Sequence, residues 1–295
     1  MDRYLRVIDR NWGVGTHGMV IRVARQAAAT GRFLARVLAF LALLPAAFAQ
    51  TPEPDVPVPG PPPLSPSCEV PAADIAMPAP LPHLQADLQA KRTIRVLAIG
   101  SSSTVGLGAS SPAQNYPSQL EQILERTFKG IDVVIINRGV SGEAAAATAD
   151  RLKTIVGLEK PDIVLWQVGT NDALMRVPIE EFRATVIDTV RWLKEREIDT
   201  VLVGLQYTLK VSKDEHYRNI RMALRDIASQ ESVLLVRRYE AMEFIERAKE
   251  GVLVSPDELH LNDLGYRCMA EHIARAMVVS AFIRGKAAPR AARRL

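Results

Sequence analysis

Cysteine, histidine and aromatic residues are scarce in this chain, and each shortage excludes a class of protein. Two cysteines in 295 residues are too few for a disulfide-dense scaffold. The five histidines and two cysteines form no cluster with metal-ligand spacing, so we expect no bound metal. Aromatic residues make up 5% of the sequence, which argues against a stacking surface for single-stranded nucleic acid. The hydrophobic content of 48% is that of a globular protein and excludes a fully disordered chain.

The chain also lacks an evenly basic body, although its formal net charge is +4. The positive charge is concentrated at the two ends: residues 1–49 carry a net charge of +5, and residues 284–295 hold five basic residues. Residues 50–283 carry a net charge of −6. A nucleic-acid-binding domain needs a basic face, so we expect no nucleic-acid partner. We interpret residues 284–295 as a solvated basic tail.

The N-terminal region has the pattern of an export signal. Several arginines precede the apolar run Val37–Leu44, and Ala47-Phe48-Ala49 follows it. This pattern predicts a signal peptide over residues 1–49, cleaved after Ala49, and a periplasmic or secreted mature protein. The uncharged stretch Val37–Ala49 is 13 residues long. A membrane-spanning helix needs about 20 residues, so we expect no transmembrane segment in the mature chain.

A proline-rich stretch follows the predicted signal peptide. Proline lacks a backbone N–H and resists both helix and sheet, so we interpret residues 50–92 as an extended linker. This linker contains Cys68, and the second cysteine is Cys268, in a predicted helix near the C-terminus. In an oxidising compartment we expect a Cys68–Cys268 disulfide that fastens the linker to the folded domain. The alternative is two free thiols.

Residues 93–283 alternate between two hydrophobic patterns, which predicts one α/β domain. Short, nearly continuous apolar runs are typical of strands buried on both faces of a parallel sheet, and the pattern predicts a three-layer α/β/α sandwich with a five-stranded parallel sheet. The predicted strands are Ile94–Ile99, Val133–Ile136, Ile163–Val168, Thr200–Leu205 and Val233–Val236. The predicted helices are Pro117–Phe128, Ala144–Val156, Ile179–Glu195, Asp214–Ser229, Tyr239–Lys249 and Asp263–Phe282.

Ligands of such sheets bind beyond the carboxyl ends of the strands, so the segments there are the candidate site. The first, Gly100–Gly108, has neither the lysine of a phosphate-binding loop nor the glycine spacing of a dinucleotide fingerprint. This disfavours a nucleotide or flavin binder, and we expect no cofactor. A Gly-x-Ser-x-Gly elbow is also absent, because Thr104 stands two residues after Ser102. What remains is a turn of small residues that presents a hydroxyl group.

Three further segments carry polar or glycine residues after or between predicted elements. Gly142 lies near the start of a predicted helix, where its N–H is available as an oxyanion donor. Asn171, in Gly169–Asp172, follows a buried strand and has a side-chain amide for the same purpose. Asp257 lies three residues before His260, close enough to bind Nδ1 of the imidazole and leave Nε2 free to accept a proton. Each segment alone is equally compatible with an ordinary turn.

Taken together, the four segments resemble the signature blocks of the SGNH/GDSL hydrolase superfamily, in the same order, over roughly residues 93–280. The resemblance implies a flavodoxin-like α/β/α fold and a serine esterase mechanism. It implies Ser102, Asp257 and His260 as catalytic residues, and Ser102, Gly142 and Asn171 as the oxyanion hole. One departure is Ser101, which stands where the family usually has aspartate. The position in the block favours Ser102 over its serine neighbours as the nucleophile.

These observations predict an exported serine esterase whose substrate is a small-molecule or glycan ester. No long apolar insertion is present to form a lipid groove, which favours a short acyl group on a carbohydrate or cell-wall glycan. Two alternatives remain: an enzyme of the lysophospholipase or lipase type, and a non-catalytic member that binds a glycan. Four residues at or near strand ends are candidates for a sugar site, with core packing favoured for the tryptophan: Trp166, Gln167, Gln206 and Tyr207.

Overall fold

The computed structural model describes residues 60–248 and 252–283, which all belong to the unit Pro54–Leu295. The predicted signal peptide with its cleavage site after Ala49 lies outside the described residues, and so does the basic tail 284–295. Within the described ranges, no helix is both long enough and apolar enough to cross a membrane.

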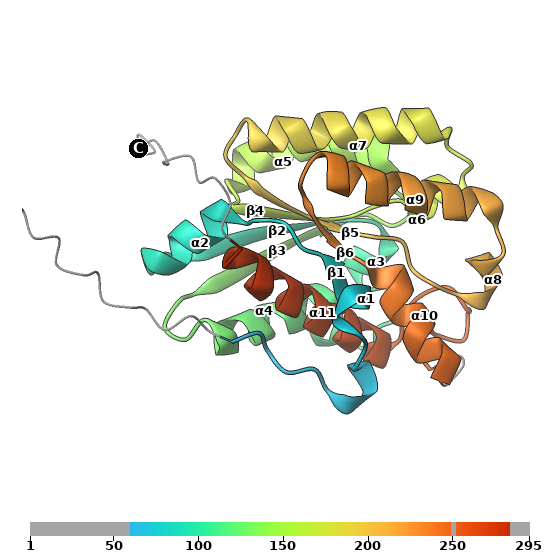
Figure 1. The fold of residues 1–295 in the computed structure, drawn as a ribbon, viewed down its shortest axis with the longest axis horizontal. Helices are drawn as coiled ribbons and strands as arrows, with labels where there is room; N and C mark the ends of the chain where they lie inside the picture. Colours follow the sequence, from blue (N-terminus) through green and yellow to red (C-terminus); the bar gives the residue numbers. More distant parts are fainter. Residues whose placement is uncertain (1–59, 249–251, 284–295) are drawn as a thin grey trace, which may run out of the picture. The chain divides into compact units, whose positions relative to one another are not determined.

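One sheet of six strands forms the centre of this unit, in the order β1-β6-β5-β4-β2-β3 (Figure 1). The strands are β1 (Ala76–Met77), β2 (Ile94–Gly100), β3 (Val133–Gly139), β4 (Ile163–Gln167), β5 (Asp199–Val203) and β6 (Leu234–Val236). Strands β2 to β6 pair in parallel, as predicted. Counted among themselves, these five have the order 2-1-3-4-5 of flavodoxin-like folds. The chain reverses direction across the sheet between β2 and β4, and a ligand site is expected at this point.

The prediction of five strands was wrong by one, and part of the predicted linker is folded. Residues 60–92 contain η1 (Pro66–Cys68), α1 (Ala72–Ile75), β1 and α2 (Pro82–Gln89). Strand β1 pairs antiparallel with β6 and forms one edge of the sheet. Proline does not prevent these elements, because η1 and α2 each begin at a proline. At the first position of a helix the missing N–H of proline has no acceptor to lose.

The helix α11 (Asp263–Ala281) holds the beginning of the described chain, around residues 62–68, in place. The Sγ atoms of Cys68 and Cys268 are joined by a disulfide. One carboxylate oxygen of Glu271 accepts hydrogen bonds from the backbone N–H and the hydroxyl of Ser65, at 2.7 and 3.1 Å. The Nη1 atom of Arg275 donates to the carbonyl of Pro62 at 3.0 Å. Residues three and four positions apart lie on one face of a helix, and the residues that hold the segment have this spacing: Cys268, Glu271, His272 and Arg275.

Helices cover both faces of the sheet and complete three layers. The longer ones besides α11 are α4 (Tyr116–Thr127), α5 (Ala145–Glu159), α7 (Ile179–Lys194), α9 (Glu215–Gln230) and α10 (Arg238–Ala248). The shorter ones are α3 (Ser102–Val105), η2 (Pro112–Gln114), α6 (Thr170–Leu174) and α8 (Leu209–Ser212). Helices α5, α7 and α9 cover one face, and α4 and α11 cover the other (Figure 1). The α/β/α sandwich predicted from the sequence is therefore confirmed.

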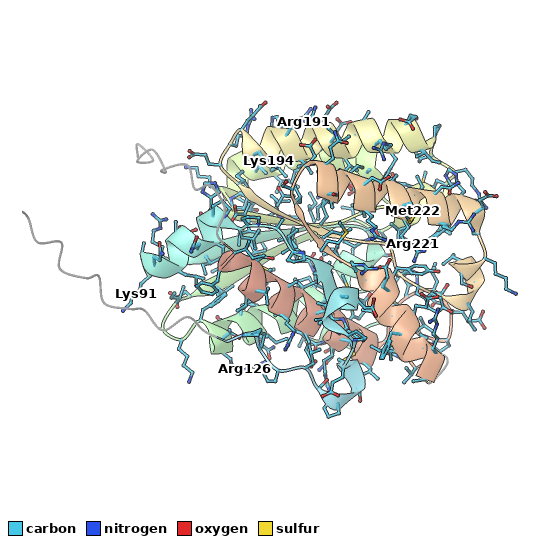
Figure 2. All side chains as sticks on the ribbon, viewed as in Figure 1. Lys91, Arg126, Arg191, Lys194, Arg221 and Met222 are labelled. Carbon is cyan, nitrogen blue, oxygen red and sulfur yellow. A yellow bond between two sulfur atoms is a disulfide. The ribbon has the colours of Figure 1, made fainter. Side chains whose placement is uncertain are left out.

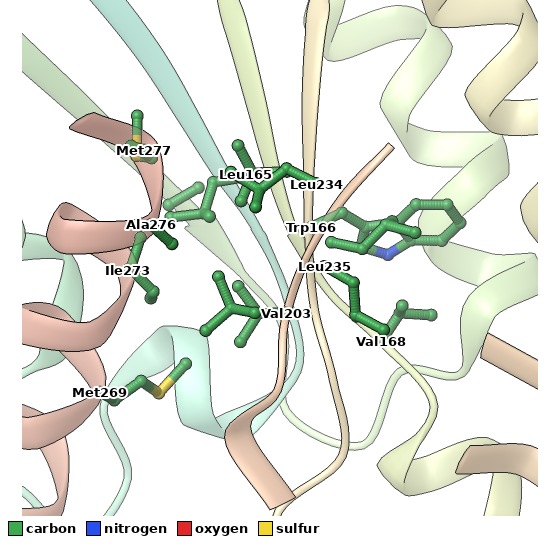
Figure 3. Close-up of a cluster of buried hydrophobic side chains, with 14 of the residues drawn as sticks. Leu165, Trp166, Val168, Val203, Leu234, Leu235, Met269, Ile273, Ala276 and Met277 are labelled. Atoms are coloured by element: carbon green, nitrogen blue, oxygen red, sulfur yellow. The ribbon is translucent and has the colours of Figure 1, made fainter. Parts of the chain in front are cut away.

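The outer faces of the helices are charged, as Arg191 and Lys194 on α7 show (Figure 2). Both extend to Glu231 at the end of α9, with the Arg191–Glu231 ion pair at 2.8 Å. The inner faces are apolar. Figure 3 shows Leu165 and Leu234 directed toward α11, while Trp166 lies on the opposite face of the sheet. Because neighbouring residues of a strand face opposite sides, these strands require apolar residues at every position.

Candidate active site

The turn between β2 and α3 presents Ser102 at the carboxyl end of β2. Gly100 has a φ of +147°, and a Cβ atom there would lie 2.6 Å from the carbonyl oxygen of Gln167 on β4, so only glycine fits. The backbone N–H and the hydroxyl of Ser101 both donate to Oε1 of Gln167, at 3.1 and 2.8 Å. Ser102 is the first residue of α3. Its backbone N–H is therefore one of those without an acceptor inside the helix.

His260 connects this serine to Asp257. The Nε2 atom of His260 lies 3.1 Å from Oγ of Ser102, and Nδ1 lies 2.5 Å from Oδ2 of Asp257. The other carboxylate oxygen accepts the backbone N–H groups of Leu259 and His260, at 3.0 and 2.9 Å. Partial burial raises the pKa of Asp257, but the hydrogen bonds from His260 and these N–H groups outweigh it and lower that pKa to about 2. An anionic Asp257 keeps the Nδ1 proton of His260 in place and leaves Nε2 free to accept one.

Two loops hold the histidine and the serine together. Residues Val254 and Leu261 form an antiparallel bridge around the turn that carries His260. Gly108, after α3, lies against this turn so closely that a Cβ atom would be 2.4 Å from the carbonyl oxygen of Leu261. Two residues later, Ser110 donates its backbone N–H and its hydroxyl to Asp263 at the start of α11, at 2.8 and 2.6 Å. The loop that follows Ser102 is therefore fixed to the loop that carries His260.

Asn171 and Gly142 follow the carboxyl ends of β4 and β3 and line the same cavity as Ser102. The Nδ2 atom of Asn171 donates to the carbonyl of Glu143 at 2.8 Å. An amide nitrogen carries two hydrogens, so this bond fixes the side chain and leaves one donor. The carboxylate of Asp172 accepts the N–H of Ala145, the first residue of α5, at 2.9 Å. Burial raises the pKa of Asp172, although this bond opposes the shift.

These groups surround one cavity of about 270 Å³. Ser102, Gly142, Asn171 and His260 all line it, and Asp257 lies behind His260. The structure thus brings together all five residues that the sequence resemblance indicated. The remaining lining residues are Ser101, Ser103, Leu107, Ser141, Thr170, Leu174, Gln206 and Leu259.

The candidates for a sugar site have separate roles. Trp166 is fully buried in the core, as favoured from the sequence, and Gln167 holds Ser101. Gln206 lines the cavity, but its amide is bound to groups of the protein. Its Nε2 atom donates to the carbonyl of Leu259, and its Oε1 accepts a short hydrogen bond from Arg238. Sequence reasoning did not find Arg238, because an arginine at the start of a helix has no pattern that distinguishes it from a surface charge.

In the part of the chain that the structure describes, no group of three or more His, Cys, Asp or Glu residues is placed to hold a metal ion.

A model of the non-GDSL lipase-like family matches residues 67–282. The chain belongs to this family. Membership in the non-GDSL lipase-like family confirms the assignment to the SGNH/GDSL hydrolases made from the four sequence blocks. The family name agrees with Ser101, which replaces the aspartate of the usual block.

Several relatives of this non-GDSL lipase-like protein are esterases. Esterase TesA from Pseudomonas aeruginosa is 24% identical over 111 residues, which cover 38% of this chain and 54% of the relative. A two-domain esterase active on acetylated mannans has a structure with a TM-score of 0.62 at 20% identity, covering 75% of this chain and 60% of that one. A variant of Axe2, an acetyl-xylooligosaccharide esterase from Geobacillus stearmophilus, has a TM-score of 0.56 at 20% identity, covering 65% and 97%. The chain thus spans slightly more than half the length of esterase TesA and of the two-domain esterase.

Proposed function

We propose that the protein is a serine esterase that removes a short acyl group from a carbohydrate. One observation carries the proposal. The imidazole of His260 lies between the carboxylate of Asp257 and the hydroxyl of Ser102, with Nε2 within 3.1 Å of Oγ, at the wall of a cavity. This arrangement activates a serine hydroxyl for nucleophilic attack.

The reaction follows from these contacts. Oγ of Ser102 attacks the carbonyl carbon of the ester while Nε2 of His260 takes the hydroxyl proton. Asp257 stabilises the resulting imidazolium. When the tetrahedral intermediate collapses, the bond to the alcohol oxygen breaks and His260 returns the proton to that oxygen. A water molecule then attacks the acyl-enzyme with His260 again as the base, which releases the carboxylic acid and restores Ser102.

The negative charge of the tetrahedral intermediate needs donors on the opposite side of the serine. We assign this role to the backbone N–H groups of Ser102 and Gly142 and to the second amide hydrogen of Asn171. All three residues line the same cavity, and the bond from Asn171 to Glu143 fixes the amide before substrate binds. Donors held in place before the reaction stabilise the developing charge without reorganisation.

The size of the cavity supports a small acyl group. Sites for drug-sized ligands have volumes of about 300–1,000 Å³, and this cavity, at about 270 Å³, is smaller. Two structural neighbours are an esterase active on acetylated mannans and a variant of an acetyl-xylooligosaccharide esterase. We therefore propose acetyl groups on a polysaccharide or oligosaccharide as the first substrates to test.

A second candidate, an enzyme for longer acyl chains, is favoured by two exposed leucines at the cavity. The side chains of Leu107 and Leu174 line it and are 48% and 44% exposed. An apolar rim of this kind provides contact for an alkyl chain that extends out of the cavity.

We further propose that the enzyme works in the periplasm or outside the cell. The leader pattern over residues 1–49 supports export. The Cys68–Cys268 disulfide supports it as well, because disulfides persist in oxidising compartments and are rare in the cytosol.

The test uses p-nitrophenyl esters of two, four and eight carbons with wild-type protein and the variants Ser101→Ala, Ser102→Ala and Ser103→Ala. We expect the highest kcat/KM with acetate and its loss by at least about a thousandfold in Ser102→Ala. Ser101→Ala and Ser103→Ala are matched controls from the same turn and should keep measurable turnover. Release of acetate from acetylated glucomannan and xylan then tests the carbohydrate.

The outcomes separate the candidates. A preference for the eight-carbon ester supports the long-chain enzyme and contradicts the short-acyl proposal. Well-folded wild-type protein that hydrolyses none of these esters and no acetylated glycan contradicts the esterase proposal and supports a glycan-binding role. Full activity in Ser102→Ala assigns the nucleophile elsewhere.

A further inference from the structure

A buried arginine lies behind the candidate active site and has no role in the mechanism above. Arg238, the first residue of α10, is 2% exposed. Its Nη2 atom donates to Oγ of Ser103 at 3.1 Å and to Oε1 of Gln206. Among the described residues, no carboxylate forms an ion pair with it, and its Nε and Nη1 atoms have no hydrogen-bond partner. A buried guanidinium without a carboxylate is costly, so its position needs an explanation.

Three tyrosines interact with this cation, and none of them neutralises it. Tyr116, Tyr217 and Tyr266 all interact electrostatically with Arg238. Burial raises the pKa of each hydroxyl, that of Tyr266 to about 12, so all three stay neutral at physiological pH. Their hydroxyls form hydrogen bonds with Oγ1 of Thr104, the carbonyl of Gln206 and the carbonyl of Leu107, respectively. The tyrosines therefore supply no counter-charge, and the hydrogen bonds of the guanidinium go to Ser103 and Gln206.

Gln206 connects Arg238 to the histidine. Its Nε2 atom donates to the carbonyl of Leu259, the residue before His260, at 2.7 Å. The two ends of an amide are nearly the same size, and only the hydrogen-bond partners decide which end faces which. Arg238 offers donors only, so Oε1 of Gln206 must face it, and the N–H₂ group must then face Leu259. The cation thus sets the orientation of the amide that holds the histidine turn.

The same guanidinium also reaches the nucleophile turn. Ser103, which accepts a hydrogen bond from Arg238, follows Ser102 directly, and its hydroxyl lies 3.4 Å from Oε1 of Gln206. We propose that Arg238 is a positioning residue of the esterase, which acts through Gln206 to hold His260 at hydrogen-bond distance from Ser102. This inference rests on the proposed esterase function. Arg238 does not line the cavity, so it acts without contact with the substrate.

The decisive variant is Gln206→Glu, which has nearly the same shape. A glutamate keeps the acceptor for Arg238 and adds a charge partner, so a purely structural role predicts equal or higher stability and unchanged turnover. The positioning role predicts a different result. The carboxylate has no N–H to give, and its second oxygen would face the carbonyl oxygen of Leu259, which repels it. We expect kcat for p-nitrophenyl acetate to fall at least about tenfold while the midpoint of thermal unfolding does not fall.

Arg238→Lys and Arg238→Met show whether the effect begins at the arginine. We expect Arg238→Lys to retain more of the wild-type kcat than Arg238→Met, because lysine keeps the charge and a donor. Arg238→Met should lower kcat with little change in KM. Combined with Gln206→Glu, it should lower kcat no further, because both changes interrupt one chain of contacts. The matched control is Arg221→Met on α9 (Figure 2), since Arg221 stacks on Tyr239, 3.9 Å from the ring centroid, and does not line the cavity.

A crystal structure of Gln206→Glu separates this inference from the proposed function, because it requires no activity. We expect the Leu259 carbonyl to turn away from residue 206 and Nε2 of His260 to lie beyond hydrogen-bond distance of Oγ of Ser102. An unmoved His260, or unchanged kcat in Gln206→Glu where the wild type is active, overturns the inference. If the wild type hydrolyses no ester, the esterase proposal fails and the geometry alone decides whether Arg238 positions His260.

Discussion

The Nε2 atom of His260 lies 3.1 Å from the hydroxyl oxygen of Ser102, although the two residues are 158 positions apart in the chain. Neither residue is placed by its own element alone. Ser102 depends on the close approach of Gly100 to β4, and His260 depends on a turn that Gly108 packs against. The distance between the two side chains therefore depends on the packing of two loops. Changes in either loop should lower turnover before they affect folding.

Asp257→Asn should lower kcat strongly and leave KM nearly unchanged. An asparagine can offer its N–H₂ group to Nδ1 of His260, which favours the tautomer with the proton on Nε2 and removes the base. In serine proteases this change costs about 10⁴-fold in kcat. Steady-state kinetics with p-nitrophenyl acetate measure the effect. The adjacent Glu258→Gln is the control, since Glu258 is exposed; equal kinetics for the two variants would contradict the role of Asp257.

Asn171→Ala should lower kcat by about 10²–10³-fold, the usual effect of removing one oxyanion donor. The amide is fixed by its bond to Glu143, so its remaining hydrogen is available when negative charge develops. An interaction made only in the transition state changes kcat and kcat/KM equally. A variant with raised KM and normal kcat would show that Asn171 binds the substrate and does not stabilise the oxyanion.

Removal of the disulfide should lower stability. We expect the double variant Cys68→Ser with Cys268→Ser to lose about 2–5 kcal/mol of the free energy of unfolding. Urea unfolding with and without reductant measures this loss. The wild type should lose a similar amount on addition of reductant, and the double variant should not respond. Wild-type protein with the same unfolding curve in both conditions would contradict a contribution from the disulfide.

The buried His272 should make stability depend on pH. Burial lowers the pKa of His272 below its usual 6.5, although its hydrogen bond to the carbonyl of Cys68 opposes the shift. Between the lowered pKa and 6.5 the unfolded chain binds more protons than the folded one, so the free energy of unfolding rises with pH in this range. The contribution of His272 to stability is therefore complete above pH 6.5 and is lost as the pH falls through the lowered pKa.

The test is His272→Gln, whose amide can donate to the same carbonyl but does not titrate. We expect its free energy of unfolding, measured with urea, to decrease less between pH 7.5 and pH 5 than that of the wild type. A decrease equal to that of the wild type would assign the effect to other groups.

The parallel strands and the longer helices could be predicted from the sequence, mostly to within one or two residues, because strands buried on both faces appear as continuous apolar runs. The strand Ile163–Gln167 is an example, since all five of its residues are buried. Strand β1 could not be predicted. It has two residues, Ala76 and Met77, between proline-rich segments, and it exists only because β6 offers an unpaired edge.

The residues of the site also divide into those that could be predicted from the sequence and those that could not. Residues such as His260 and Asn171 were found because their order along the chain resembles that of a known superfamily. Arg238 was not found, and Gln206 was indicated only as a candidate for a sugar site. Their contribution depends on which end of the Gln206 amide faces the buried guanidinium of Arg238, and the two residues are 32 positions apart in the sequence. Contacts of this kind exist only after the sheet has formed.

The bond between Cys68 and Cys268 makes the chain between them a closed covalent loop, with a sequence separation of 200. A protease that cuts once inside this loop opens it but releases no fragment, because both pieces remain joined through the two sulfurs. The high effective concentration of the joined pieces favours their reassociation. In the exported enzyme that we propose, a single cut would therefore leave the two pieces joined and able to keep activity, and gels run with and without reductant would distinguish the cut molecule from the intact one.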